Sequence, residues 1–420
     1  AALRLAERWR LRPLRRRAVA RAERWIRQRL PASDGLGAIF PPILNTILAF
    51  RALGYAVDDP VIADQLRELE RLELGDGEAL WVQPCFSAVW DTALAVNALV
   101  ESGVPRDDGR LRRAARWLAA REARRPGDWR VKCPRAEPSG WYFEYANEFY
   151  PDCDDTAQVV TSLAKIEPAG AEAAEHGAQR GRAVRWLLAM QSGSGGWASF
   201  DKDCDRQVLT HIPFADHNAM IDPPTVDVTA RVLEALACAG VDPSAPAIRR
   251  AVDFVLGQQE ADGSWYGRWG CNYLYGTWLA LVGLERVGED TRRSAWGARA
   301  RGWLERCQNG DGGWGELPAS YSDRRRKGEG PSTASQTAWA VLGLLAAGDR
   351  SGAVERGVRH LLAGQRADGA WQDEFWTGTG FPEVFYLRYH LYATYFPLLA
   401  LARWRRDQEA AGGASPKLSA

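Results

Sequence analysis

Three carboxyl groups crowd into four residues of the chain, in the run Tyr150-Pro151-Asp152-Cys153-Asp154-Asp155-Thr156-Ala157. Like charges this close resist simultaneous ionisation, so one carboxyl group can stay protonated well above the usual aspartic acid pKa of about 3.9. The run opens an apolar stretch that we expect to be helical, and a helix N-terminus favours carboxylates. A neutral carboxylic acid in apolar surroundings is what alkene protonation requires. Asp152, Asp154 and Asp155 are therefore candidate catalytic residues.

Two simpler interpretations of this run fit less well. A calcium-binding loop needs a glycine and a bidentate glutamate at the positions that Ala157 and Leu163 occupy here. Helix capping alone needs one aspartate rather than three.

A second acidic cluster contains Asp227 and Arg231, which are four residues apart and so share one face of the predicted helix. Taken alone, the two residues form an ordinary surface ion pair. Beside Asp154, the cation would instead orient the acid and favour the carboxylate that remains after proton transfer.

Aromatic residues form a third group of candidates. They gather around Trp141-Tyr142-Phe143, around Trp269 and between Phe381 and Phe396. The Gly-rich run from Trp376 to Pro382 predicts that loops present many of these rings. Ring faces attract cations, which would suit a reaction that passes through carbocations.

These candidates need a scaffold, and the sequence repeats supply one. A Gln followed by a Gly-rich turn that ends in Trp recurs in copies ending at Trp197, Trp265, Trp314 and Trp371, and a weaker copy ending at Trp129 has Arg121 in place of the Gln. Helical stretches at 156–163, 228–236 and 337–345 lie between copies and are apolar on more than one face, as in helices packed on both sides. Two helices per unit, joined by Gly turns and closed into a toroid, is the simplest arrangement. The Gln and Trp residues are expected to tie neighbouring turns together and to do no chemistry.

Composition excludes several other classes. The 54 Lys and Arg residues balance 53 Asp and Glu residues, which argues against nucleic-acid binding. The seven cysteines are widely separated, so we expect reduced thiols rather than disulfides or a zinc site. We expect no membrane-spanning run and no signal peptide. Residues 1–30 form a basic amphipathic stretch that suits either an anionic membrane surface or a solvated helix, and residues 407–420 are expected to be disordered.

The Asp-Xaa-Asp-Asp-Thr-Ala motif at 152–157, the Gln–Trp repeats and the run from Gly267 to Thr277 resemble the bacterial squalene–hopene cyclases over about residues 35–405. The resemblance implies an all-α fold: an (α/α)6 barrel at 61–406 that carries the catalytic site, preceded at 1–60 by the remnant of a second α/α barrel. Oxidosqualene cyclases carry Asp-Cys-Thr-Ala at the acid, so the extra carboxyl groups here favour squalene over its epoxide.

By position, the resemblance implies that Asp154 is the proton donor, that Asp152 and Asp155 flank and prime it, and that Phe214 lies near the substrate entrance. It also implies a cavity lined by cation-stabilising residues, namely Trp90, Phe143, Phe200, Trp269, Tyr275, Phe381, Phe385, Tyr389 and Tyr392. Members of the family use neither a metal nor an organic cofactor. They are monotopic membrane proteins and often homodimers, so we expect a peripheral protein on the cytoplasmic face of the bacterial inner membrane.

The chain departs from the best-known relative at several positions. Arg231 stands where that relative has a His beside the acid, Phe200 replaces a Tyr, and Phe40 replaces a Gln near the final deprotonation site. Most of the second barrel is also absent. Because family cavities lie between two barrels, an incomplete second barrel would admit water, which quenches carbocations.

Other functions remain open. A cyclase of another linear polyprene fits the same residues, as does an inactive fragment that keeps the barrel. A protein prenyltransferase β-like subunit shares similar helical repeats, but it needs zinc held by Asp, Cys and His, and the chain has only five His and no such grouping.

Overall fold

The structure, a computed structural model, describes residues 14–170, 172–211, 219–349, 351–410 and 412. These residues form two compact units: unit 1 extends to Ala88 and includes Tyr142–Tyr150, and unit 2 comprises Val89–Trp141 and the chain from Pro151 onward. The sequence-based boundary lay earlier, at residue 60. The loop at 142–150 belongs to unit 1 because it bonds back to the chain near Asp34, whose amide donates to the Ala146 carbonyl at 2.9 Å.

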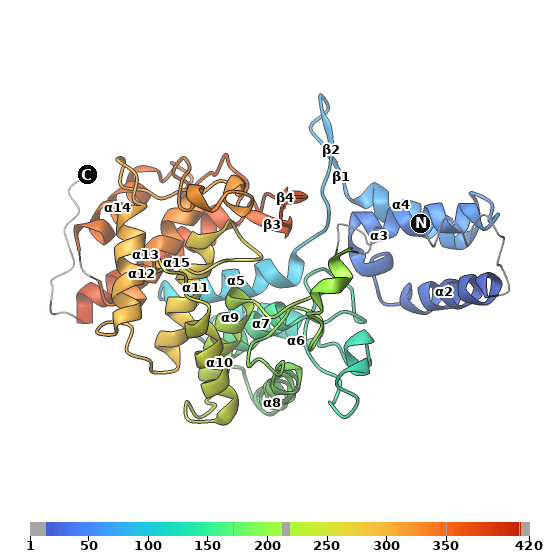
Figure 1. The fold of residues 1–420 in the computed structure, drawn as a ribbon, viewed down its shortest axis with the longest axis horizontal. Helices are drawn as coiled ribbons and strands as arrows, with labels where there is room; N and C mark the ends of the chain where they lie inside the picture. The colour runs from blue at the N-terminus through green and yellow to red at the C-terminus, as the bar shows by residue number, and fades with distance from the viewer. Residues whose placement is uncertain (1–13, 171, 212–218, 350, 411, 413–420) are drawn as a thin grey trace. The chain divides into compact units, whose positions relative to one another are not determined.

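Unit 2 is an α/α toroid, as predicted, and its described helices alternate between an inner and an outer set (Figure 1). The inner helices are α5 (Ala88–Glu101), α7 (Cys153–Lys165), α9 (Val226–Cys238), α11 (Tyr273–Arg286), α13 (Ala334–Ala346) and α15 (Tyr392–Ala410). The outer helices are α6 (Gly109–Ala119), α8 (Glu172–Met190), α10 (Pro246–Gly257), α12 (Ala295–Arg306) and α14 (Gly352–Ala363).

Burial explains which helices lie inside. In α9 every residue from Val226 to Leu236 is buried, as expected of a helix covered on all sides. In the outer helix α10 only Ile248, Ala251, Val252 and Val255 are buried, at the three- and four-residue spacing of a single apolar stripe.

The inner helices close into a ring. Consecutive pairs from α7 to α15 pack directly against each other. Side-chain hydrogen bonds tie α5 to both ends of this series: the Ser162 hydroxyl donates to the Ala93 carbonyl at 2.8 Å, and the Trp90 indole donates to the Tyr392 hydroxyl at 3.0 Å. The first and last inner helices therefore meet.

Each Gln–Trp repeat joins an outer helix to the next inner helix. The indole of Trp197 donates to the Leu187 carbonyl of α8 at 2.7 Å, and its backbone amide donates to the Thr229 hydroxyl of α9 at 2.9 Å. The Gln191 amide donates to the turn carbonyl of Gly195 and to Ala247 in the first turn of α10. The Gln residues thus tie neighbouring turns together, as predicted.

The weakest repeat was misassigned from the sequence. Trp141, not Trp129, makes the repeat contacts: its indole donates to the Leu118 carbonyl at 2.7 Å and its amide donates to the Thr156 hydroxyl at 2.9 Å. The long loop between α6 and Trp141 hid this copy, because it breaks the regular spacing of the other four.

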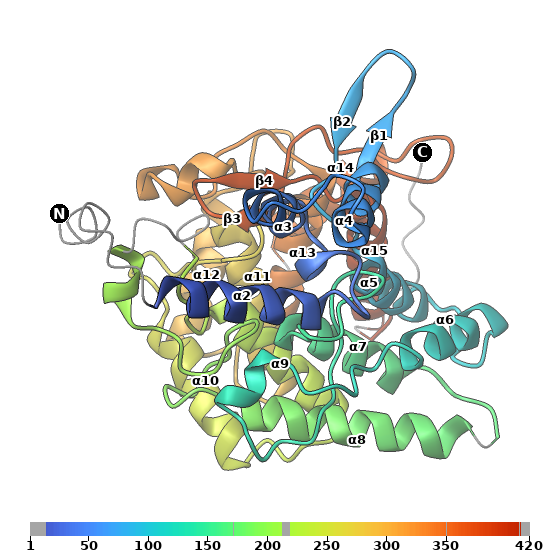
Figure 2. The ribbon, with the colours of Figure 1, turned by 90° about the vertical axis from the view of Figure 1, so that its right-hand side faces the viewer.

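Unit 1 contains the helices α2 (Arg15–Arg29), α3 (Phe40–Ala52) and α4 (Pro60–Arg71), of which α3 and α4 pack side by side (Figure 1). A two-stranded hairpin, β1 (Glu73–Gly75) paired with β2 (Leu80–Val82), projects from these helices (Figure 2). Short 3-10 helices lie at Leu36–Ala38 in this unit and, in unit 2, at Asp128–Val131, Gln207–His211, Pro318–Tyr321 and Arg324–Arg326.

Three details differ from the sequence-based expectation. Neither β1–β2 nor the second hairpin, β3 (Gly378–Phe381) with β4 (Phe385–Leu387), was predicted. The expected tail is helical over its first residues, because α15 continues to Ala410. Several rings assigned to loops, including Tyr275 and Tyr392, stand on helices.

All seven cysteines are free thiols, as predicted. Within the described ranges, no helix has the length and apolar character needed to cross a bilayer.

The close packing of α9 on α11 depends on Gly283. A Cβ at this position would lie 2.5 Å from the Ala230 carbonyl oxygen, so the two helices would have to separate. We expect Gly283→Ala to lower the free energy of unfolding by about 1–3 kcal/mol, as overpacking usually does, measured by urea denaturation followed by circular dichroism.

Gly177 of α8 is the matched control, because a Cβ there would meet no atom within 4 Å. Gly177→Ala also gains helix propensity of up to about 1 kcal/mol, so we expect it to be neutral or slightly stabilising. Equal destabilisation of both variants would contradict the close approach at Ala230.

Candidate active site

The repeat contacts anchor the first turn of four inner helices, α7, α9, α11 and α13. Thr156, Thr229, Thr277 and Thr337 each accept a hydrogen bond from a repeat Trp amide, at 2.9–3.0 Å. Thr92 and Thr394 are the corresponding threonines by sequence in α5 and α15. The residue two places before each threonine lies in the first turn of its helix, so these residues share one end of the ring. They are Trp90, Asp154, Asp227, Tyr275, Ser335 and Tyr392.

Asp154 is held by a buried cation. The Nε of Arg231, on α9, donates to Asp154 Oδ1 at 2.6 Å. The Arg231 side chain is 3% exposed and that of Asp154 is 14% exposed, so the acid retains an accessible edge while its partner is buried. The prediction that Arg231 orients the acid is consistent with this geometry.

Both terminal nitrogens of Arg231 also donate hydrogen bonds. Its Nη1 donates to Gln158 Oε1 at 3.1 Å, and its Nη2 donates to the Tyr275 hydroxyl at 2.8 Å. Its guanidinium carbon lies 4.8 Å from the centre of the Trp90 ring, a cation–π contact. Contacts with three other inner helices, α5, α7 and α11, therefore fix the planar guanidinium in one orientation.

The pKa of Asp154 reflects two opposed effects. Burial raises it, the positive charge of Arg231 lowers it, and the negative charge of Asp227 raises it again, with a net increase to about 6. The acid can therefore be populated in its neutral form close to neutral pH, while Arg231 stabilises the carboxylate left after proton loss.

Asp152 and Asp155 support the start of α7. Asp152 is the N-cap, and its Oδ1 accepts the Asp155 amide at 2.7 Å. Both residues are 3% exposed. Burial raises the pKa of Asp152 to about 7, although a side-chain hydrogen bond with Asp155 opposes the increase. Because an ionised carboxylate only accepts, that hydrogen bond requires a proton on the pair.

Asp227 does not form the surface ion pair that its spacing from Arg231 suggested. Both residues are almost fully buried, and Arg231 turns to Asp154. Asp227 Oδ2 instead accepts the backbone amides of Arg268 and Trp269, at 2.7 and 2.8 Å. Its carboxylate thus positions the backbone of one candidate aromatic residue. The i to i+4 spacing places two residues on one face but does not choose their partners.

Asp222 performs the same task for another aromatic residue. Its Oδ2 accepts the amides of Phe200 and Asp201, at 2.6 and 2.9 Å. The rings of Phe200 and Trp269 meet edge to face with centroids 6.3 Å apart. Sequence reasoning did not identify Asp222, Gln158 or Arg268 as site residues, because their roles depend on backbone amides and side chains distant in sequence.

The predicted aromatic residues of unit 2 fall into two groups, each beside an arginine. Trp90, Tyr275, Tyr389 and Tyr392 lie around Arg231, with Tyr389 stacked on Tyr392 at 4.4 Å. Phe200, Trp269, Phe381 and Phe385 lie around Arg268, whose guanidinium carbon is 4.1 Å from the Trp269 ring centre and 5.6 Å from that of Phe381.

Two predicted residues stay outside this description. Phe143 belongs to unit 1, and Phe214 lies outside the described residues. Across the described ranges, no three His, Cys, Asp or Glu side chains are grouped so that they could hold a metal ion.

Comparison with known proteins supports the fold first. The ent-copalyl diphosphate synthase from Streptomyces platensis superposes with a TM-score of 0.52 at 21% identity, over 83% of this chain and 55% of that one. The sequence then matches the profile of the squalene-hopene cyclase C-terminal domain over residues 86–406 and that of the N-terminal domain over residues 1–78. The chain belongs to the squalene–hopene cyclase family.

Several curated relatives cover nearly the whole chain. The squalene–hopene cyclases of Zymomonas mobilis and Alicyclobacillus acidocaldarius are each 42% identical over 94% of this chain, corresponding to 62% and 63% of their own lengths. The dammaradiene synthase of Dryopteris crassirhizoma is 40% identical over 95% of this chain and 61% of that protein. The chain therefore spans somewhat under two thirds of the length of these relatives.

The protonation state of Asp152 generates a stability prediction. Its pKa is higher in the folded chain, at about 7, than the usual 3.8, so protonation stabilises the fold. That contribution is complete below pH 3.8 and is lost as pH rises through about 7. Asn keeps the N-cap but cannot ionise, so we expect Asp152→Asn to flatten the fall in melting temperature between pH 4 and pH 7, measured by circular dichroism.

Asp108 provides a control, because it also caps a helix but its pKa is lowered to about 2 by Arg110. Asp108→Asn should leave the pH dependence between pH 4 and pH 7 as in the unmodified chain. An unchanged slope in Asp152→Asn would show that Asp152 is ionised throughout this range.

Proposed function

We propose that this chain is the acid-bearing barrel of a cyclase that converts squalene to hopene, or to hopanol when water traps the last cation. The observation that carries the proposal is the Asp154–Arg231 pair, in which a buried cation holds a carboxyl group whose pKa is near 6. Arg231 occupies Oδ1, so the reactive proton resides on Oδ2. Transfer of that proton to a terminal alkene would start the cascade.

Family membership and two further features support the proposal. The carboxyl pair at Asp152 and Asp155 fixes the first turn of α7, so Asp154 is presented from a rigid element. The aromatic residues near Arg231 and Arg268 offer ring faces and edges to cationic intermediates.

A second candidate is the cyclisation of another linear polyprene, or of squalene to a different product. The similarity to a protein named dammaradiene synthase favours keeping this possibility, because the same acid can begin cascades that end differently. The neutral products of the assay below separate the two.

We also propose that the protein acts at the cytoplasmic surface of a bacterial inner membrane, with a homodimer as its expected assembly. Helix α2 supports surface binding: it carries seven arginines and one glutamate, has no buried residue, and leaves Trp25 40% exposed. Such a helix suits the interface of an anionic bilayer.

Asp154 is expected to be indispensable for turnover. We expect incubation of the chain with squalene in detergent to yield cyclised triterpene, identified by gas chromatography and mass spectrometry of the neutral lipids. Asp154→Asn should lower the rate on the order of 1,000-fold or more, because the amide cannot act as the acid. In the unmodified chain the rate should fall as pH rises through about 6, where Asp154 loses its proton.

Asp205→Asn serves as the control, since Asp205 is an exposed aspartate. The control should behave like the unmodified chain. Turnover by Asp154→Asn near the unmodified rate would remove Asp154 as the acid, and the absence of any cyclised product would contradict the proposal for this chain.

Membrane binding should depend on the charge of α2. Replacement of Arg15, Arg16 and Arg17 by Gln should weaken binding to phosphatidylglycerol vesicles on the order of 100-fold, since each basic residue contributes about 1 kcal/mol at an anionic surface. The same triple change at Arg324, Arg325 and Arg326, which are also largely exposed, controls for net charge. Equal weakening by both variants in vesicle sedimentation would show that α2 has no special role.

A further inference from the structure

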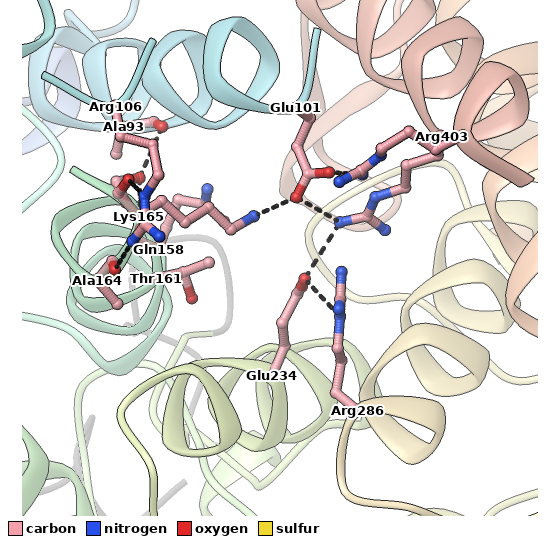
Figure 3. A network of polar contacts seen from close by, with 12 residues as sticks. Ala93, Glu101, Arg106, Gln158, Thr161, Ala164, Lys165, Glu234, Arg286 and Arg403 are labelled. Carbon is pink, nitrogen blue, oxygen red and sulfur yellow. Dashed lines mark hydrogen bonds and ion pairs between the residues drawn. The ribbon is translucent and has the colours of Figure 1, made fainter. Parts of the chain in front are cut away.

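A buried charge network lies at the end of the barrel opposite Asp154, where the inner helices terminate (Figure 3). Lys165 of α7 donates to Glu101 of α5 at 2.7 Å. Arg403 of α15 lies 3.3 Å from Glu234 of α9 and 4.0 Å from Glu101. Arg286 of α11 completes the set, at 3.6 Å from Glu234.

The network is shielded but reaches solvent. The side chains of Glu101 and Lys165 are 5% and 15% exposed. Glu101 also pairs with Arg406, whose side chain is 51% exposed. A proton can therefore enter the network from water without crossing the acid-bearing end of the barrel.

A polar face of α7 runs from the acid to this network. Asp154, Gln158 and Ser162 are spaced four residues apart, and Lys165 follows one turn later. At a rise of about 1.5 Å per residue, Asp154 and Lys165 are about 16 Å apart along the helix.

Helix α5 contributes a matching face. Ala93, Asn97 and Glu101 are also four residues apart. Ser162 of α7 bonds the Ala93 carbonyl and Lys165 of α7 bonds Glu101, so Asn97 lies on the side of α5 that faces α7.

Two buried amide atoms on these faces have no partner within the described part of the protein. Gln158 is 2% exposed and must present Oε1 to Arg231, because Arg has no acceptor; its Nε2 donor is left unpaired. Asn97 is 6% exposed, and its Oδ1 acceptor is also unpaired. Buried polar atoms are rarely left unsatisfied, and ordered water is the usual partner where protein atoms do not serve.

The proposed reaction creates a need for such water. Each cyclisation removes a proton from Asp154, and the product cation releases its proton far along the substrate chain, so the acid must be recharged. An apolar hydrocarbon covering the exposed edge of Asp154 offers no proton from that side.

We propose that water molecules held by Gln158 and Asn97 return a proton to Asp154 through the interior of the barrel, from Lys165 in the opposite charge network. The inference rests on the proposed function. In each cycle an N–H bond of the Lys165 ammonium breaks. The proton passes along this row of hydrogen-bonded water molecules, the water file, and an O–H bond forms on Asp154. Lys165 then takes a proton from solvent, so the enzyme returns to its starting state.

The environment of Lys165 suits this role. Burial lowers the pKa of Lys165, the facing charge of Arg403 also lowers it and that of Glu234 opposes them, with a net decrease to about 8. The other groups that face it are Glu101 of α5, Cys238 of α9 and Arg286 of α11. Its ammonium is thus a stronger acid than that of an ordinary lysine.

The first test is independent of turnover. A crystal structure that resolves ordered water should show water bonded to Gln158 Nε2 and to Asn97 Oδ1, continuing toward Lys165. In Asn97→Leu the water at that position should be missing while the helices keep their places. A dry interior, with both amides bonded to protein atoms, would overturn the proposal even if squalene is cyclised.

The second test separates the first turnover from later ones. With Asp154 already protonated, Lys165→Met and Asn97→Leu should convert the first equivalent of squalene at the unmodified rate. Steady-state turnover of Lys165→Met should then fall on the order of 100-fold, because recharging becomes limiting.

Arg286→Met is the matched control, since it removes another cation of the same network but lies outside the path to Asp154. It should retain normal steady-state turnover. Equal slowing of Arg286→Met and Lys165→Met, or slowing of the first turnover by Lys165→Met, would overturn the relay. If the chain forms no cyclised product, the proposed function fails and the crystallographic test still decides whether the water file exists.

Discussion

The organisation of unit 2 depends on holding one carboxyl group near the balance point between its neutral and ionised forms, beside a permanent positive charge. Burial alone would make Asp154 a weak acid that never ionises, and Arg231 alone would keep it ionised and inert. The two effects nearly balance, with a pKa near 6. This balance requires Arg231 to stay fixed, which is why its donors and its flat face all have partners on surrounding helices.

Arg268 is a second arginine that lies against candidate aromatic residues, as Arg231 does. Arg231 lies over Trp90 and Arg268 lies over Trp269, so one face of each ring already has a cation. In the proposed cascade, a carbocation would be stabilised at the other face of each ring or at neighbouring rings.

Sequence reasoning predicted the toroid and the helix at Asp154 from periodicity and local motifs, and it offered Arg231 beside the acid only as an alternative to a surface ion pair. It failed where long-range contacts decide. Trp141 replaces Trp129 in the first repeat because a loop of irregular length separates it from α6. Asp227 serves backbone amides rather than Arg231, and no spacing rule specifies that choice. The roles of Gln158 and Asp222 likewise appear only when separate helices and loops come together.

The hydrogen bond between a repeat tryptophan and a threonine has a consequence for how such a site can be changed. It anchors α7, α9, α11 and α13 through corresponding threonines, so the residue two places earlier enters the same end of the ring in each of these four helices. Within each three-residue motif, the threonine therefore holds the helix in place and the residue two positions earlier supplies the side chain at the end of the ring. A designer could exchange a member of the ring, such as Ser335, without altering the threonine that holds its helix, and so vary the reagents of the barrel one position at a time.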